Sequence, residues 1–276
     1  FHVRTARRVW FDVGASEAGI LGVEVDLGHG ADAGGASVDV RIFDGTPIQV
    51  LTAFLDEVGR ATELPAWVLR LWASGNEWNT QAVVAAQVAR HEAEDIPVGV
   101  VVIEAWSDEE GFTVFRDARY APHLDGQPHT ASDFTYPADG AWPDPAGLVA
   151  DLHAQGGKVG LWQIPLQRTD VELGAEAAAD AALIEARGYG VAEADGTAYR
   201  NRGWWFPRAL MPDLTNPQAR AWWLEKRRWL VRDLGVDGFK TDGGEHAWGN
   251  DLRYLDGRHG DEANSTFPVS YAKAYG

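Results

Sequence analysis

From about residue 61 onward, the sequence alternates between short apolar runs and longer segments in which apolar residues recur at helical spacing. The apolar runs cover residues 67–74, 98–106, 157–165 and 236–242, and the helical segments cover residues 79–96, 144–156 and 216–235. Nearly continuous apolar runs are typical of parallel strands that are covered on both faces. The alternation therefore predicts βα units around a parallel sheet.

Two α/β architectures are compatible with four such units. One is the eight-stranded (β/α)8 barrel, of which four units make half, and the other is an open doubly wound sheet. No glycine-rich phosphate loop follows the first apolar run, which weighs against the doubly wound, nucleotide-binding type. The chain has 276 residues, 45% of them hydrophobic, and is long enough for a barrel with additions.

The first 60 residues have a different pattern. Residues 3–13 and 36–45 alternate apolar and polar side chains, as half-buried strands do, and the glycine-rich residues 27–37 separate them. Residues 48–60 have helical spacing and lead into a linker at residues 64–67. We therefore expect residues 1–60 to be part of an antiparallel β-sandwich domain with a linker helix, and residues 61–276 to be a separate α/β unit.

Acidic and indole side chains follow the apolar runs. Because the carboxyl ends of parallel barrel strands share one rim, we expect these side chains to meet there. They are Trp72 and Glu77 after the first run, Glu104, Trp106 and Asp108 after the second, Trp162 and Gln163 after the third, and Lys240, Asp242, Glu245 and His246 after the fourth. Carboxylates accept hydrogen bonds from hydroxyl groups and indoles stack on sugar rings, so the rim suits a neutral, polyhydroxylated ligand.

The overall charge excludes some partners. A net charge of −17 argues against nucleic acid and against an anionic membrane surface. No apolar run is long enough to span a bilayer. The absence of cysteine excludes a thiol nucleophile, and the 13 tryptophans are compatible both with core packing and with sugar binding. A cytoplasmic location is our default expectation, and a homo-oligomer is left open.

Six segments, in the same order, resemble those of glycoside hydrolase family 31, whose members include retaining α-glucosidases and α-xylosidases. The segments are LPAW (64–67), DIPVGVVVIEAW (95–106), WPDPAGLVADLHAQGGKVGLWQIP (142–165), PDLTNPQARAWW (212–223), LGVDGFKTDGGE (234–245) and FPVSYAKAYG (267–276). The resemblance implies a (β/α)8 TIM barrel, of which about strands one to four lie in this chain, with an insertion after strand three at about residues 166–212. It also implies hydrolysis of α-linked glycosides from the non-reducing end, through a covalent glycosyl-enzyme intermediate.

The resemblance assigns roles to individual residues. Asp242 is the expected nucleophile. Lys240 lies two residues earlier, on the same face of the strand, where it could keep Asp242 ionised. The expected substrate-binding residues are Glu104, Trp162, Lys240, Trp106 and Trp72, and the expected supporting residues of the nucleophile loop are Glu245 and His246. Glu104 falls where the family usually has Asp, so the usual sugar preference is in question. Trp204 and Trp205 could flank a sugar subsite or pin the insertion to the barrel.

The resemblance places the acid/base carboxyl, an Asp, on a loop after strand six. The sequence ends before strand five, so we expect this residue outside the chain, and we expect the chain to be a piece of a longer enzyme. No organic cofactor and no metal are expected.

Two other functions are open at this point. Asp242, Glu245 and His246 could bind a metal together with Glu104, as in a metal-dependent barrel hydrolase, although no HxH or HExxH motif occurs. A non-catalytic carbohydrate-binding module would keep the same strands without the missing carboxyl.

Overall fold

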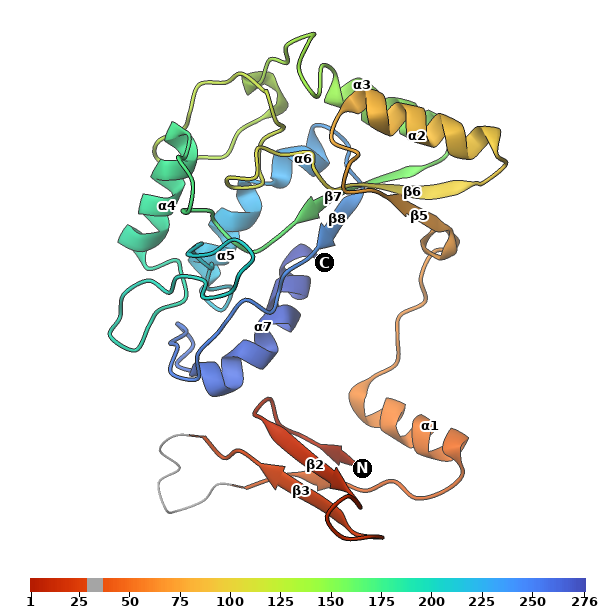
Figure 1. Cartoon of the computed structure of the whole chain (residues 1–276), viewed down its shortest axis with the longest axis vertical. Helices are drawn as coiled ribbons and strands as arrows, with labels where there is room; N and C mark the ends of the chain where they lie inside the picture. The colour runs from red at the N-terminus through yellow and green to blue at the C-terminus, as the bar shows by residue number, and fades with distance from the viewer. Residues whose placement is uncertain (29–36) are drawn as a thin grey trace.

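The computed structural model describes residues 1–28 and 37–276 (Figure 1). The N-terminal part contains β1 (His2–Val3), β2 (Val9–Val13), β3 (Leu21–Val25), β4 (Val40–Arg41) and α1 (Pro47–Val58). The rest contains η1 (Ala66–Leu69), β5 (Leu71–Ser74), α2 (Gln81–Ala93), β6 (Val98–Ile103), η2 (Ala131–Asp133), α3 (Pro145–Ala154), β7 (Lys158–Gln163), α4 (Ala175–Arg187), α5 (Pro217–Glu225), α6 (Arg228–Arg232), β8 (Gly238–Thr241) and α7 (Gly260–Tyr275).

The second part is built on a parallel sheet. Its strands lie in the order β5-β6-β7-β8, which is also their order along the chain, and every neighbouring pair is parallel. This confirms the predicted βα units and their spatial order. All four strands therefore end at the same edge of the sheet.

The two faces of the sheet have different roles. Helices α2 and α3 lie over one face of the sheet, its outer face (Figure 1). Val101 and Ile103 of β6 and Val159 and Leu161 of β7 belong to the same buried core as residues of these two helices. Each of these side chains, once buried, contributes about 1.5–3 kcal/mol to folding. Because side chains alternate along a strand, Glu104, which follows Ile103, points to the other, inner face. The hydrophobic core thus fixes which residues line the inner face.

Local sequence signals set the helix starts. Thr80 caps α2 by accepting a hydrogen bond from the amide of Val83 at 3.2 Å. Asn216 caps α5 and Pro217 occupies its first position, where a missing amide hydrogen does no harm.

Two predicted elements differ from the structure. The strand expected at residues 67–74 begins only at Leu71, where pairing with β6 starts, and the preceding residues form the short helix η1. The helix expected at residues 216–235 is interrupted at Lys226 and Arg227. Both side chains turn into the protein interior to meet buried polar partners, and this separates α5 from α6.

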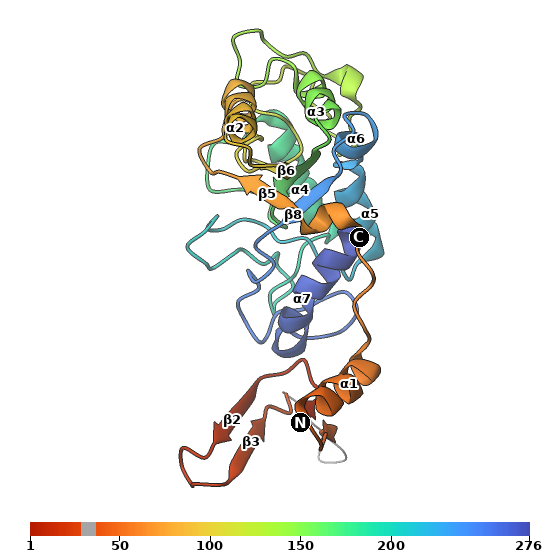
Figure 2. The same ribbon diagram turned by 90° about the vertical axis from the view of Figure 1, so that its right-hand side faces the viewer.

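The N-terminal strands form two small antiparallel pairs, β1 with β4 and β2 with β3. Figure 2 shows them at one end of the molecule, with α7 between them and the parallel sheet. Arg7 forms ion pairs with Asp261 and Glu262 at the start of α7. The predicted strand at residues 36–45 is reduced to β4, and most of the predicted glycine-rich separator lies outside the described residues.

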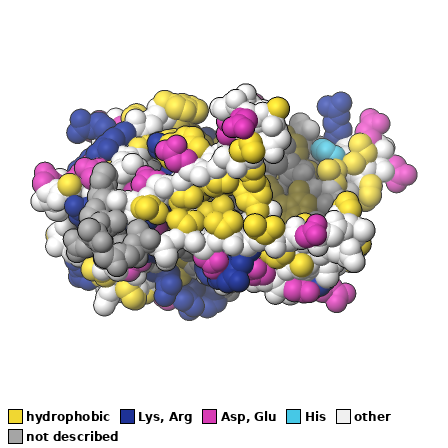
Figure 3. Space-filling model, turned by 90° about the horizontal axis from the view of Figure 1, so that it is seen from below, with side chains coloured by type: hydrophobic (Ala, Val, Ile, Leu, Met, Phe, Trp, Pro, Cys, Tyr) yellow, Lys and Arg dark blue, Asp and Glu magenta, His cyan; other side chains and the backbone are white. Residues whose placement is uncertain are grey.

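Apolar side chains are exposed on this N-terminal region. Figure 3, seen from below, shows them gathered on one face of the molecule. The strand register places the exposed side chains of Phe11, Val13, Leu21 and Val23 on one face of the β2–β3 pair, and Phe1 packs against Phe11. An apolar area of this kind is typical of a surface that packs against another protein layer.

Candidate active site

Four of the predicted site residues meet on the inner face, at the carboxyl ends of three neighbouring strands. Trp162 of β7 lies opposite Lys240 of β8 in the strand register, and Asp242 follows two residues after Lys240 on the same face. Glu104 directly follows β6. The structure therefore brings together Glu104, Trp162, Lys240 and Asp242, which are up to 138 residues apart in sequence (242 minus 104).

The carboxylate of Asp242 is held from several sides. The indole Nε1 of Trp162 donates a hydrogen bond to Asp242 Oδ2 at 3.0 Å, and the amide of Gly243 donates to Oδ1 at 2.8 Å. The Lys240 ammonium nitrogen lies 3.9 Å from Oδ2. These contacts hold both carboxylate oxygens in one position, as attack on a single carbon atom requires. Asp242 is only half-buried, so a ligand can reach it.

Gly243 is required by the turn that follows Asp242. Its φ of +69° lies in the left-handed region, and a Cβ there would come within 2.6 Å of the Ile164 side chain. Asp242 itself continues the sheet, because its amide donates to the Gln163 carbonyl at 2.8 Å. The chain thus ends the strand and turns away immediately after the carboxylate.

Glu104 shares the cation with Asp242. Its Oε1 lies 3.0 Å from the Lys240 nitrogen and also accepts a hydrogen bond from the Ser74 hydroxyl. Ser74 was missed by the sequence interpretation, although it is the last residue of β5 and shares the inner face with Trp72 through the two-residue period. The two-residue period of the strand could therefore have identified Ser74 from the sequence.

Two predicted substrate contacts are not in this group. Trp106 has no exposed surface, and its Nε1 donates to the carbonyl of Trp162 at 2.9 Å. Its indole fills the core and offers no exposed surface to a sugar, unlike the rim position expected from the sequence. Trp72 lies within β5, opposite Val100 of β6, and not at the carboxyl end of the strand. Its side chain is on the same face as that of Ser74, two residues later. It stacks on Trp67, with ring centroids 6.0 Å apart, and lines a separate cavity of about 110 Å³ near the amino ends of the strands.

Trp162 is held by other aromatic rings. Phe112 contacts it edge-on at a centroid distance of 5.3 Å, and Trp205 of the long segment after β7 lies 5.8 Å away. Only 8% of the Trp162 surface is exposed. These rings fix the indole in one orientation, with its Nε1 directed at the carboxylate of Asp242.

The residues after Asp242 lie differently from expectation. Glu245 is exposed, and its carboxylate makes no hydrogen bond within residues 1–28 and 37–276, so the predicted support of the loop is not seen. The loop is instead held by Tyr199, whose hydroxyl donates to the His246 carbonyl at 2.7 Å and accepts from the Trp248 amide at 3.1 Å.

The His246 ring is buried beside Trp205, at a centroid distance of 5.6 Å. Burial lowers the pKa of His246, while the charges of Glu245 and Asp242 act in the opposite direction. The imidazole is therefore neutral at pH 7. Among the described residues, no set of three His, Asp or Glu side chains is arranged to hold a metal ion.

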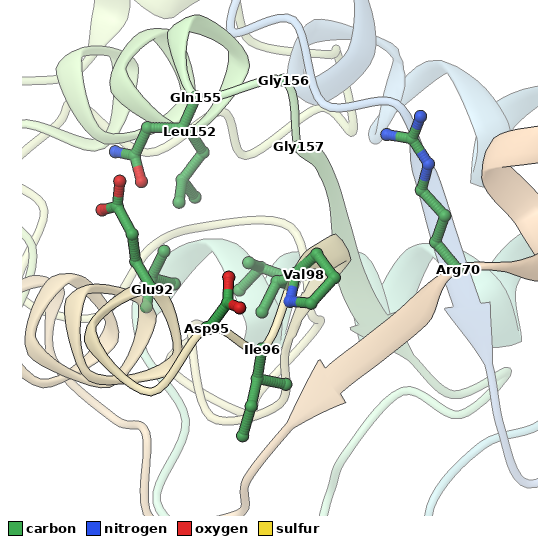
Figure 4. A pocket seen from close by; sticks show the side chains of 12 residues that line it. Arg70, Glu92, Asp95, Ile96, Val98, Leu152, Gln155, Gly156 and Gly157 are labelled. Carbon is green, nitrogen blue, oxygen red and sulfur yellow. The ribbon is translucent and has the colours of Figure 1, made fainter.

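A larger cavity of about 310 Å³ lies elsewhere. It is formed where α2 and α3 end and β6 and β7 begin, at the opposite end of the strands from Asp242. Figure 4 shows Arg70, Glu92, Asp95 and Gln155 around it. None of Glu104, Trp162, Lys240 and Asp242 lines this cavity. In the part of the chain that the structure describes, no helix has the length and apolar character to cross a membrane.

Parallel βα units with a carboxylate, an ammonium group and indoles at their carboxyl ends define a barrel-type α/β domain suited to carbohydrate ligands. Residues 61–275 match the family description "Glycosyl hydrolases family 31 TIM-barrel domain", and the chain belongs to that family.

Several relatives support this assignment. The chain is 60% identical over 276 residues to the 1,3-alpha-isomaltosidase of Kribbella flavida, and 37% identical over 250 residues to the isomaltosyltransferase of Sporosarcina globispora. The match to the isomaltosidase includes 100% of this chain and 37% of that protein. The match to the isomaltosyltransferase includes 89% of this chain and 23% of that protein.

Solved structures of similar proteins have the same fold as this chain. The cycloalternan-degrading enzyme from Trueperella pyogenes in complex with a covalent intermediate superimposes with a TM-score of 0.93 at 60% identity, covering 99% of this chain and 37% of that one. The same enzyme in complex with isomaltose gives a TM-score of 0.94. The chain thus spans little more than a third of these relatives.

Proposed function

We propose that the intact protein containing this chain is a retaining α-glycoside hydrolase in which Asp242 is the nucleophile. The observation that carries the proposal is the Asp242 carboxylate, reachable from solvent and held at the end of β8 by Trp162, Gly243 and Lys240. A nucleophilic carboxylate must be fixed beneath the anomeric carbon, and these contacts support that position for Asp242.

The reaction proceeds in two displacements. Asp242 attacks the anomeric carbon and forms an ester bond, while the bond to the leaving oxygen breaks and that oxygen takes a proton from a second carboxyl. Water, deprotonated by the same second carboxyl, then displaces Asp242 and restores the α configuration. We assign the second carboxyl to a part of the protein outside residues 1–276. Glu104, with Lys240 and Ser74 fixing its position, accepts hydrogen bonds from sugar hydroxyls.

We infer that the substrate is an α-glucan that carries isomaltosyl units at its non-reducing end. The relatives that are 60% identical are named for isomaltose release and for cycloalternan degradation, and one is described in complex with isomaltose. Glu104 in place of the family's usual Asp is in keeping with a preference other than single glucosyl or xylosyl residues.

We also propose the domain arrangement. Residues 61–276 form the first half of the (β/α)8 barrel, interrupted by an insertion at about residues 166–212, and residues 1–60 form part of a β-sandwich domain with a linker helix. The exposed apolar side chains of β2 and β3 support a second layer over this face.

The test uses the intact protein with Asp242→Gly. Turnover should fall by at least about 10³-fold, because the covalent step has lost its nucleophile. Azide, a small anion, should fill the vacated space and restore turnover with a β-glycosyl azide as product, identified by NMR. Unchanged turnover, or loss that azide does not rescue in a variant with unchanged folding by circular dichroism, would refute this role for Asp242.

A further inference from the structure

Trp204 is 89% exposed, more than any other large hydrophobic side chain among the described residues. Most tryptophans of a folded domain bury their rings because each ring removes a large apolar area from water. Four indoles of this chain, Trp106, Trp142, Trp223 and Trp229, are fully buried in this way. Core packing therefore does not account for the position of the Trp204 ring.

The loop that carries Trp204 has a fixed conformation. Asn201 is buried, and its side-chain amide donates to the carbonyls of Trp205 at 2.6 Å and Phe206 at 2.9 Å, while its Oδ1 accepts from the amide of Gly203. Phe206 and Arg208 both have positive φ, at +47° and +65°. Such a backbone costs about 1–3 kcal/mol per residue and persists only where its surroundings hold it. The loop thus presents the indole in one place.

The loop is continuous with the Asp242 site. Trp204 stacks on Trp205, with ring centroids 6.2 Å apart and an interplanar angle of 24°. Trp205 is half-buried and contacts Trp162, the residue that donates to Asp242. Trp205 therefore pins the loop to the barrel, and Trp204 lies two ring-to-ring steps from Trp162 toward solvent. Of the two roles considered from the sequence, the contacts of Trp205 fit the one of pinning the insertion to the barrel.

We propose that Trp204 is a stacking platform for a glucosyl ring on the leaving-group side of the cleaved bond. The inference rests on the proposed function, because an enzyme that takes the non-reducing end into its site leaves the remainder of the substrate pointing to solvent. A flat indole face at that outer position matches the C–H face of a glucosyl ring. The platform contributes to binding of the leaving group and takes no part in bond cleavage.

The test compares two substrates of the intact protein. One is an oligosaccharide with at least two glucosyl units after the cleaved bond, and the other is the α-isomaltosyl fluoride, whose leaving group is too small to reach Trp204. Trp204→Ala should lower kcat/KM for the oligosaccharide by about 10-fold, mainly through KM, because one aromatic stacking contact is lost. It should leave kcat/KM for the fluoride within about 2-fold. Trp204→Phe, which keeps a flat ring, should restore most of the loss.

Trp10, 47% exposed on β2, provides the matched control, and Trp10→Ala should change neither substrate. Equal losses on both substrates with Trp204→Ala would overturn the proposal, since they would mean that Trp204 acts through Trp205 on the site itself. No loss on the oligosaccharide would overturn it as well. Hydrolysis of the fluoride that depends on Asp242 establishes the proposed function independently. If the unaltered protein hydrolyses neither substrate, both the function and the platform fail.

Discussion

At the scale of single residues, Lys240 is the cation that Glu104 and Asp242 share. Its nitrogen lies 3.0 Å from Glu104 and 3.9 Å from Asp242, so Glu104 has the closer contact. Asp242 compensates with two hydrogen-bond donors of its own, Trp162 and Gly243. The two carboxylates thus have separate environments on one inner face, one suited to attack and the other to holding hydroxyl groups.

The length of the Glu104 side chain should therefore be critical. Glu104→Asp keeps the charge but withdraws the carboxylate by about one bond length from Ser74 and Lys240. We expect kcat/KM on an isomaltosyl substrate to fall by about 10- to 150-fold, the factor for losing hydrogen bonds to a charged group. Steady-state kinetics on isomaltosyl and glucosyl fluorides gives the kcat/KM of the variant and of the unaltered protein. Equal activity with the variant would contradict a substrate contact for Glu104.

Asp108 gives a prediction about pH. Burial raises the pKa of this half-buried residue to about 7, and the nearby Glu110 and Glu176 act in the same direction. The folded state therefore keeps a proton that the unfolded chain loses near its ordinary value of 3.8. Between pH 4 and 7 the folded state binds more protons, so this group's contribution to stability decreases as pH rises through that window.

Asp108→Asn removes this titration. Compared with the unaltered protein, the variant should gain stability as the pH rises from 4 to 7, and the difference should be constant above pH 7. Thermal unfolding midpoints of both proteins, measured at intervals across this range, give the difference directly. Parallel curves from pH 4 to 8 would show that Asp108 has no raised pKa.

At the scale of elements, a buried ionic cluster joins α4 to the end of α5. Lys226 lies 2.5 Å from Glu176 and 2.9 Å from Asp180 of α4, and all three side chains are almost fully buried. His129 contacts Glu176 on its other side, at 2.6 Å. The cluster fixes α4, and with it the long segment that carries Trp205, against the barrel.

We expect Lys226→Met to lower the free energy of unfolding by about 3–5 kcal/mol, because it removes the ammonium group that two buried carboxylates share. Lys158→Met is the matched control, since Lys158 forms an exposed pair with Asp237 at 2.8 Å and should cost no more than about 1 kcal/mol. Denaturant titrations followed by tryptophan fluorescence measure both. A similar, small effect of the two substitutions would mean that the cluster does not hold α4 in place.

The parallel sheet could be predicted because its signals are local. Apolar runs, caps at Thr80 and Asn216, and the two-residue period of strands all lie within a few residues of one another. The break between α5 and α6 could not, because it depends on Glu176 and Gln163, which lie 50 and 64 residues from Lys226 and Arg227. Sequence periodicity carries no information about such distant polar partners.

For the site, too, the local features could be predicted from the sequence and the distant contacts could not. Strand ends place Glu104, Trp162, Lys240 and Asp242 on one edge, and the period of two predicts that Lys240 and Asp242 share a face. Trp106 follows a strand in the same way, yet its ring turns into the core, where Phe115 packs against it at 4.9 Å. Only tertiary packing distinguishes a core indole from one at the rim.

At the scale of the whole molecule, this chain is a part of a larger arrangement in its relatives, since it spans 37% of the Kribbella flavida isomaltosidase. The inner face with Asp242 and the apolar face of β2 and β3 are both suited to receive further layers of protein. Arg7 already joins the N-terminal strands to α7 through Asp261 and Glu262. The proposed activity should therefore be measured on the intact protein.

The intact protein should keep its activity after exhaustive chelation. An oxocarbenium-like transition state is stabilised by carboxylates, and the proposed mechanism uses no Lewis acid. Hydrolysis of an isomaltosyl substrate is measured before and after dialysis against EDTA, with a known metal-dependent hydrolase treated in parallel. Loss of activity that added metal restores would favour the metal-dependent alternative.

The covalent bond to Asp242 is the central claim, and trapping it tests that claim most directly. An activated fluorosugar, whose electronegative fluorine slows the second displacement, should accumulate as an ester on the intact protein. After proteolysis, mass spectrometry should find the adduct on the peptide that contains Asp242, and Asp242→Asn should give none. An adduct on Glu104 or Asp108 instead, or a product with inverted configuration and no adduct at all, would contradict the account.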